Sequence, residues 1–190
     1  FALVGLGSSL MIRGLVPQRA DLKRRLNPFA PYVDAIRSMR PGLIWAASLA
    51  WAWFYAGAIV VIAVIPEYTT PLGLSSSEGS LLLGSIGLGI GIGCLLAGRL
   101  SGARIRGGFT LWGGVVFGVV FLLMGLTPLT VLNVWVLAVA LLVAGTGAGF
   151  FLIPLQAIQQ MCSPSGERAR VLATANALSF LLMSLASAAY

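Results

Sequence analysis

Histidine is absent from this 190-residue sequence, and cysteine occurs only twice. Without histidine the chain can form neither a Cys/His zinc site nor a histidine-based catalytic triad. Cys94 lies within an apolar run and Cys162 in a loop, so the two thiols are not expected to meet or to oxidise. The glycines of residues 84–93 fit no GxGxxG register, which argues against a dinucleotide-binding loop. We therefore expect no catalytic residues, no metal site and no cofactor, and we predict that the chain is not an enzyme.

Charged side chains are also scarce: they make up 9% of the residues, against 58% that are hydrophobic. Too few polar side chains remain to cover a water-soluble protein of this size. Five uncharged runs are each close to the roughly 20 residues that a helix needs to cross a bilayer. They are residues 43–65, 80–98, 109–126, 134–153 and 171–190. The sequence therefore predicts an all-α, polytopic membrane helical bundle.

The basic residues are unevenly distributed. All twelve Lys and Arg residues fall in the three segments 13–40, 99–106 and 168–170. A basic segment after every second crossing follows the positive-inside rule, which predicts that these segments are cytoplasmic. The connections at residues 67–78 and 127–133 would then lie outside. The net charge of +7 is thereby explained by topology, and we expect no nucleic-acid partner.

The chain divides into three parts by composition. Residues 1–12 are apolar but too short to span, and we interpret them as the end of a truncated transmembrane helix. Residues 13–41 form a basic, proline-containing cytoplasmic linker, in which a short amphipathic helix is expected after Pro31. This helix would lie on the inner leaflet or tether two helix bundles, and the two roles are compatible. Residues 42–190 form the bundle of five spans.

Glycines recur at a spacing of four within the apolar runs. Such small-xxx-small spacing lets two backbones approach closely in lipid. The pairs are Gly87/Gly91, Gly89/Gly93, Gly114/Gly118 and Gly145/Gly149. They predict close helix packing, and an alternative interpretation is that they allow helices to slide or bend.

Three aromatic residues near the middle of the first complete span are candidates for substrate binding: Trp51, Phe54 and Tyr55. They share one helical face, whereas aromatic belts normally lie at the ends of spans. The aromatic face either lines a cavity against which an acyl chain rests or serves packing and lipid contact. Asn176, in the last span, is a further candidate that would meet a headgroup or hold helices together by hydrogen bonds.

The connection between the second and third spans carries the most motif-like residues. Gly98, Arg99, Leu100, Arg104 and Arg106 lie in or beside it. The segment resembles the Gly-x-Leu-Ala-Asp-Arg-x-Gly-Arg-Arg loop of the major facilitator superfamily, which closes the cytoplasmic side of those transporters by ion pairing. We take these residues as a candidate gating loop. Gly102 stands where the motif has Asp, which argues against the usual charge relay, and a plain positive-inside anchor would also explain the arginines.

The order of the segments resembles the C-terminal half of a major facilitator. Within that superfamily the sequence is similar to the bacterial lysophospholipid transporters, including the branch fused to an acyl-glycerophosphoethanolamine acyltransferase. The similar segments are AWAWFYAGA at 50–58, Pro66, GRLSG at 98–102, PLQA at 154–157 and RARVLATAN at 168–176. The resemblance implies a partial major facilitator fold, with the five spans as helices seven to eleven and the last helix missing.

The resemblance also implies a function. It implies a secondary transporter that moves lysophospholipid across the bacterial inner membrane for reacylation, as a multi-pass protein. Its partners would be the lipid or lysolipid substrate, the bilayer, the N-terminal half of the same chain and a fused or associated acyltransferase. Two alternatives remain open: an exporter of drugs or small metabolites, and the membrane portion of a fused acyltransferase enzyme. No charge lies inside any complete span, which suits an acyl chain better than a small hydrophilic solute.

Overall fold

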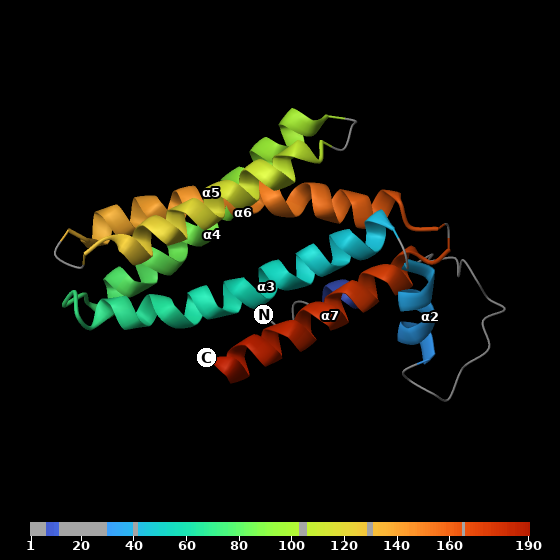
Figure 1. Ribbon diagram of the computed structural model, residues 1–190, viewed down its shortest axis with the longest axis horizontal. Coiled ribbons are helices and arrows are strands. Elements are labelled where there is room, and N and C mark those ends of the chain that lie inside the picture. Colours follow the sequence, from blue (N-terminus) through green and yellow to red (C-terminus); the bar gives the residue numbers. More distant parts are fainter. Residues whose placement is uncertain (1–6, 12–29, 40–41, 103–105, 129–130, 165) are drawn as a thin grey trace.

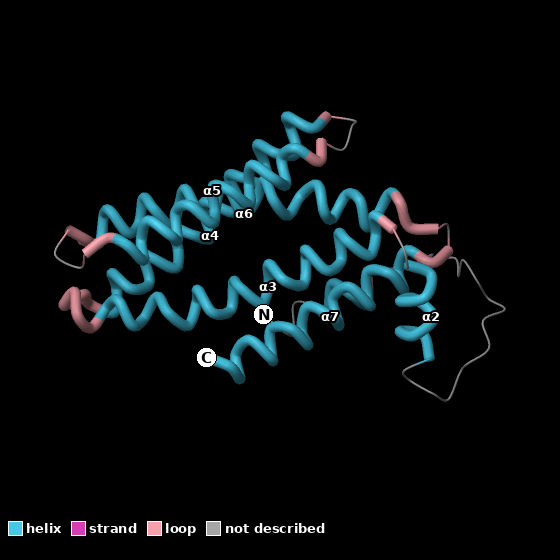
Figure 2. The backbone as a smooth tube through the Cα atoms, in the orientation of Figure 1, coloured by secondary structure: helices cyan, strands magenta, loops and turns pink. Residues whose placement is uncertain are grey.

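The computed structural model describes residues 7–11, 30–39, 42–102, 106–128, 131–164 and 166–190. These residues form helices and loops, with no strand among them (Figures 1 and 2). The labelled helices are α2 (Ala30–Met39), α3 (Leu43–Thr69), α4 (Ser76–Ser101), α5 (Gly108–Leu126), α6 (Val134–Met161) and α7 (Arg168–Ala189). Helices α3 to α7 are long and apolar enough to cross a membrane. The predicted all-α membrane bundle is confirmed for this part of the chain.

Short connections make consecutive spans run in opposite directions. Helices α3, α5 and α7 start at the end of the bundle where α2 lies, and α4 and α6 return to it (Figure 1). The arginines at the end of α4 and at the start of α7 are therefore at one end of the bundle. We call it the basic end.

Two helices that start at the opposite end have side-chain caps. The Ser75 hydroxyl accepts a hydrogen bond from the Glu78 amide, and the Glu78 carboxylate accepts one from the Ser75 amide at 2.8 Å. Asn133 Oδ1 accepts from the amides of Trp135 and Val136, each at 3.0 Å. These bonds satisfy amides that lack partners in the first turn of a helix, and so they fix where α4 and α6 begin.

Helices α4 and α6 touch through backbone at glycines. A Cβ atom added at Gly93 would lie 2.2 Å from the Thr146 carbonyl oxygen, and one at Gly145 would lie 2.3 Å from the Ile86 carbonyl oxygen. No side chain fits at such distances, so only glycine permits this approach. We call α4, α5 and α6 the glycine block, because α5 joins α6 in the same way.

The contact between α5 and α6 also depends on glycine. A Cβ atom at Gly113 would lie 2.4 Å from the carbonyl oxygen of Gly147. Gly147 is two residues from Gly145 and Gly149, which contact α4, and therefore lies roughly 160–200° around the helix from them. Helix α6 is thus held between α4 and α5 by opposite faces.

The four predicted glycine pairs do not behave alike. Gly89/Gly93 and Gly145/Gly149 make the close α4–α6 contact, as predicted. The prediction is wrong for Gly87/Gly91, because both face open space. It is also wrong for Gly114/Gly118: Gly114 contacts only the Phe151 ring and Gly118 faces open space.

Helices α3 and α7 pack side by side below the glycine block in Figure 1. Their contact uses small side chains rather than bare backbone. Small buried residues of the two helices include Ser48, Ala52 and Ala56 of α3 and Val171, Thr174, Ala175 and Ser179 of α7. At the end away from α2, the Tyr190 hydroxyl donates a hydrogen bond to Glu67. This bond raises the pKa of Tyr190.

The helix expected after Pro31 is α2. Its buried residues Ala35 and Met39 pack against Val171 of α7, and Ile36 lies beside them. The amphipathic segment therefore covers the start of the α3–α7 pair at the basic end.

Candidate functional site

Two adjoining hollows lie along the α3–α7 pair. The first, which we call the polar hollow, has a volume of about 260 Å³. It is lined by Trp51, Tyr55, Asn176, Ser179, Phe180 and Met183. Asn176 supplies an exposed side-chain amide, whereas the Ser179 hydroxyl donates to the Ala175 carbonyl oxygen of its own helix at 2.9 Å. Asn176 is therefore the group best placed to bind a polar ligand there.

The second hollow is more enclosed and has a volume of about 290 Å³; we call it the apolar hollow. All five membrane-crossing helices, α3 to α7, contribute residues to it. Its lining residues are Phe54, Tyr55, Ala58, Ile59, Val61, Ile62, Ile86, Ile90, Phe117, Ala148, Leu152 and Met183. Tyr55 and Met183 line both hollows, so an apolar compartment adjoins a more polar one.

The structure brings three of the four sequence candidates together. Trp51, Tyr55 and Asn176 surround the polar hollow. The rings of Trp51 and Tyr55, one turn apart in α3, have their centroids 5.2 Å apart. Such spacing places both rings on one face of α3, and the hollow that they line is bounded by α7 as well.

Phe54, the fourth candidate, has two roles in the structure. Its ring lies nearly parallel to that of Phe151 in α6, with centroids 5.4 Å apart and an interplanar angle of 26°. It also contacts the Phe117 ring in α5, at 5.3 Å. Phe54 therefore packs α3 onto the glycine block and also lines the apolar hollow. That an acyl chain rests against it stays a prediction.

Sequence reasoning missed most of the lining outside α3. Met183, Phe117 and Phe151 were not singled out, although each contacts or lines the site. One signal was available in α7: Asn176, Ser179, Phe180 and Met183 fall at i, i+3, i+4 and i+7, which is one stripe of a helix.

Among the described residues that line the hollows, none is charged. Among the described residues, no group of three or more His, Cys, Asp or Glu side chains could hold a metal ion. The two hollows together are therefore suited to bind an amphipathic molecule, through apolar contacts and a few hydrogen bonds.

The candidate gating loop is divided between two helices. Gly98, Arg99 and Leu100 belong to the last turn of α4, and Gly102, which caps the helix, has a positive φ of 56°. Arg99 forms no ion pair within the described part of the chain. The Arg106 guanidinium carbon lies 5.8 Å from the centroid of the Phe109 ring. Arg104 lies outside the described residues.

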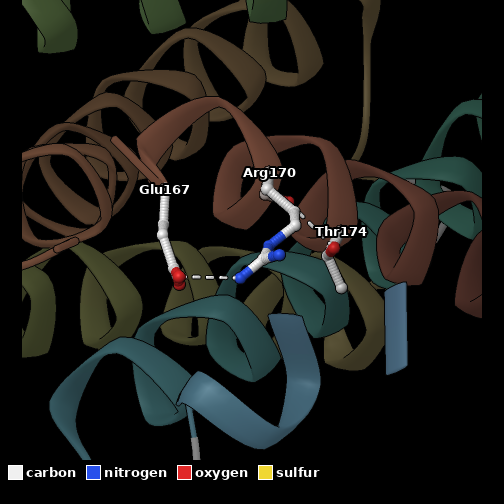
Figure 3. A network of polar contacts seen from close by, with 3 residues as sticks. All are labelled: Glu167, Arg170 and Thr174. Carbon is white, nitrogen blue, oxygen red and sulfur yellow. Dashed lines mark hydrogen bonds and ion pairs between the residues drawn. The ribbon is translucent and has the colours of Figure 1, made fainter. Parts of the chain in front are cut away.

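A small polar network fixes the start of α7 at the basic end (Figure 3). Arg170 Nη2 lies 2.8 Å from Glu167 Oε1, and the Thr174 hydroxyl donates to the Arg170 carbonyl oxygen at 2.9 Å. Glu167 occupies the N-cap position of α7, where a carboxylate interacts favourably with the helix dipole. These contacts are all local to the first turns of α7, the helix that carries Asn176.

A bundle of apolar, membrane-crossing helices around an uncharged hollow is the architecture of a multi-pass membrane transporter. The family model described as Major Facilitator Superfamily matches residues 1–187. The chain belongs to the major facilitator superfamily, and it is a secondary membrane transporter. No curated protein and no solved structure matches it.

Proposed function

We propose that this transporter moves lysophospholipid across the bacterial inner membrane for reacylation. The observation that carries the proposal is the pair of adjoining hollows, which share Tyr55 and Met183. A lysophospholipid has one acyl chain and a polar headgroup. The chain would lie in the apolar hollow against Phe54, and the headgroup would meet Asn176 in the polar hollow.

The lining chemistry supports this cargo class over small hydrophilic solutes. A hydrophilic metabolite in an uncharged, largely apolar cavity would lose hydrogen bonds to water without replacing them. An acyl chain that leaves the bilayer for this apolar cavity stays out of water, and so avoids the cost of roughly 0.8 kcal/mol for each CH₂ group exposed to water. The cavity therefore favours a molecule with a long apolar part.

The proposal includes a topology and partners. The basic end faces the cytoplasm, by the positive-inside rule, so lysolipid travels toward α2. The N-terminal half of the same chain completes the cavity, and a fused or associated acyltransferase consumes the cargo. The segment itself catalyses no reaction and binds no nucleic acid.

The test is uptake of labelled lysophosphatidylethanolamine by the full-length protein in reconstituted vesicles. Ala58 lines the apolar hollow, so Ala58→Phe should fill it and lower uptake at least tenfold per inserted molecule. Ala63, also in α3, is exposed, and Ala63→Phe is the matched control that should transport normally. The loss should grow with acyl-chain length, because longer chains need more of the hollow.

The alternatives are outcomes of the same assay. If the protein moves cationic dyes but no lysolipid, it is an exporter and the proposal is wrong. If it moves neither, but acylates lysolipid in vesicles, the segment is the membrane portion of an enzyme. Wild-type uptake by Ala58→Phe would place the cargo path outside the apolar hollow.

A further inference from the structure

A groove that is separate from both hollows runs between α5 and α6. Its volume is about 400 Å³, and it is lined mainly by apolar side chains, among them Phe109, Trp112 and Val116 of α5 and Val143 and Phe150 of α6. Gly113 and Gly147, where the two backbones touch, form its floor. The groove is deep because the two glycines have no side chain to fill it, and aromatic and branched side chains form its walls.

The groove faces away from the proposed cargo site. Val143 and Phe150 lie roughly 140–180° around α6 from Ala148 and Leu152, which line the apolar hollow. Trp112 and Val143 are 71% and 41% exposed. The N-terminal half is proposed to complete the cavity on the opposite face, so in a membrane the side with this groove is the one left for lipid.

A positive charge lies at the basic end of the groove. The Phe109 and Phe150 rings meet edge to face, with centroids 5.5 Å apart, and close that end. The Arg106 guanidinium carbon lies 5.8 Å from the centroid of the same Phe109 ring. Trp112 lies one turn further into α5, at the depth where tryptophan usually marks the membrane interface.

We propose that this groove binds a bilayer phospholipid with an anionic headgroup. One acyl chain lies along the groove between α5 and α6, and the headgroup phosphate meets Arg106. The apolar walls match an acyl chain, and the guanidinium matches a phosphate in charge and in hydrogen-bond geometry. The site is independent of the cargo proposed above.

The experiment uses Trp112 as the reporter, in full-length protein reconstituted with a low fraction of brominated lipid. Emission of the Trp112→Phe variant is subtracted, so that only quenching of Trp112 is measured. Brominated phosphatidylglycerol should bind roughly fivefold more tightly than brominated phosphatidylcholine, as expected for one basic residue at a membrane surface. Arg106→Gln should abolish this preference.

Two matched controls distinguish binding in the groove from a general effect of positive charge and from unspecific contact with lipid. Arg99→Gln, in the last turn of α4, removes an equal charge near the same end of the bundle and should keep the preference. Val143→Phe fills the groove and should lower quenching by both lipids, whereas Leu185→Phe, at an exposed position of α7, should not.

Three results would overturn the proposal. Equal quenching by the two lipids would mean that no anionic headgroup is selected. An equal loss of preference in Arg99→Gln and Arg106→Gln would mean that the charge acts diffusely. Absence of quenching by either lipid would mean that protein, such as a second copy of the chain, covers the groove.

Discussion

The glycine block and the α3–α7 pair solve the same packing problem in different ways. In the block, α6 meets its neighbours backbone to backbone, and half of its membrane-crossing window is buried, against 28% for α4 and 11% for α5. In the pair, small and aromatic side chains meet, and only 22% of each helix's window is buried. Lipid tails are as apolar as the helices, so close van der Waals packing rather than the hydrophobic effect holds such helices together.

The difference indicates which part is scaffold and which part handles ligand. A backbone-to-backbone contact leaves no side chain that could adjust at the contact, so the block is suited to stay fixed. The α3–α7 pair leaves two hollows beside Tyr55 and Met183. Substitutions in the block should therefore change stability, and those around the hollows should change transport.

The largest expected effect is that of Gly93→Ala. The new methyl group would lie 2.2 Å from the Thr146 carbonyl oxygen and 2.9 Å from the Thr146 Cα atom, so α4 and α6 must separate. We expect a loss of about 3 kcal/mol or more, measured as thermal unfolding of detergent-solubilised full-length protein.

Gly91→Ala is the matched control for this prediction. Gly91 lies two residues away in α4 and faces open space, so alanine there should be neutral or slightly stabilising because of its higher helix propensity. If Gly91→Ala and Gly93→Ala are equally harmful, helix flexibility rather than close packing explains the glycines.

The next effect tests the junction between the two regions. Phe54→Ala removes the ring that contacts both Phe117 and Phe151. Truncating a fully buried Phe costs about 3–5 kcal/mol, and the half-buried Phe54 should cost about 2 kcal/mol. Protein abundance and thermal stability should fall together with transport.

Trp53→Ala provides the comparison for Phe54→Ala. Trp53 is 76% exposed on another face of α3, and its loss should change stability little in detergent. A Phe54→Ala protein with normal stability but reduced uptake would show that the ring serves the cargo alone.

The spans could be predicted from sequence because each is uniformly apolar and has the length of a bilayer crossing. The sequence could not predict which glycine pair of α4, Gly89/Gly93 or Gly87/Gly91, makes the close helix contact. Both pairs have the same spacing in the same helix, on faces about 200° apart. Which face meets α6 depends on helix pairing, and apolar side chains of similar size encode little of that pairing.

The site was predictable only in part, because helix pairing also decides which side chains meet. Trp51, Phe54 and Tyr55 could be identified because aromatic residues are unusual at mid-depth of a span. Their partners Phe117 and Phe151 lie on other helices and have no periodic signal that links them to α3. Asn176 could be found because a polar side chain inside a span is rare, whereas Met183 resembles any apolar residue.

A smaller effect is expected at the start of α6. Asn133 Oδ1 accepts from two amides, at 3.0 Å each, and Asn133→Ala would leave both without that partner. The expected loss is about 1 kcal/mol, seen as a lower unfolding temperature with unchanged transport per folded molecule. Asn133→Asp should retain the cap, so an equal loss in both variants would contradict this explanation.

The smallest stability effect, and the sharpest contrast with Asn133, is expected at Asn176. Its side chain is exposed in the polar hollow rather than capping a helix, so Asn176→Ala should change the free energy of unfolding by less than about 0.5 kcal/mol. If the amide binds a headgroup, the same variant should raise the half-saturating lysolipid concentration several-fold at every acyl-chain length. Uptake kinetics and thermal unfolding of one preparation measure both quantities. A stability loss as large as that of Asn133→Ala, with unchanged kinetics, would instead make Asn176 a residue that holds helices together.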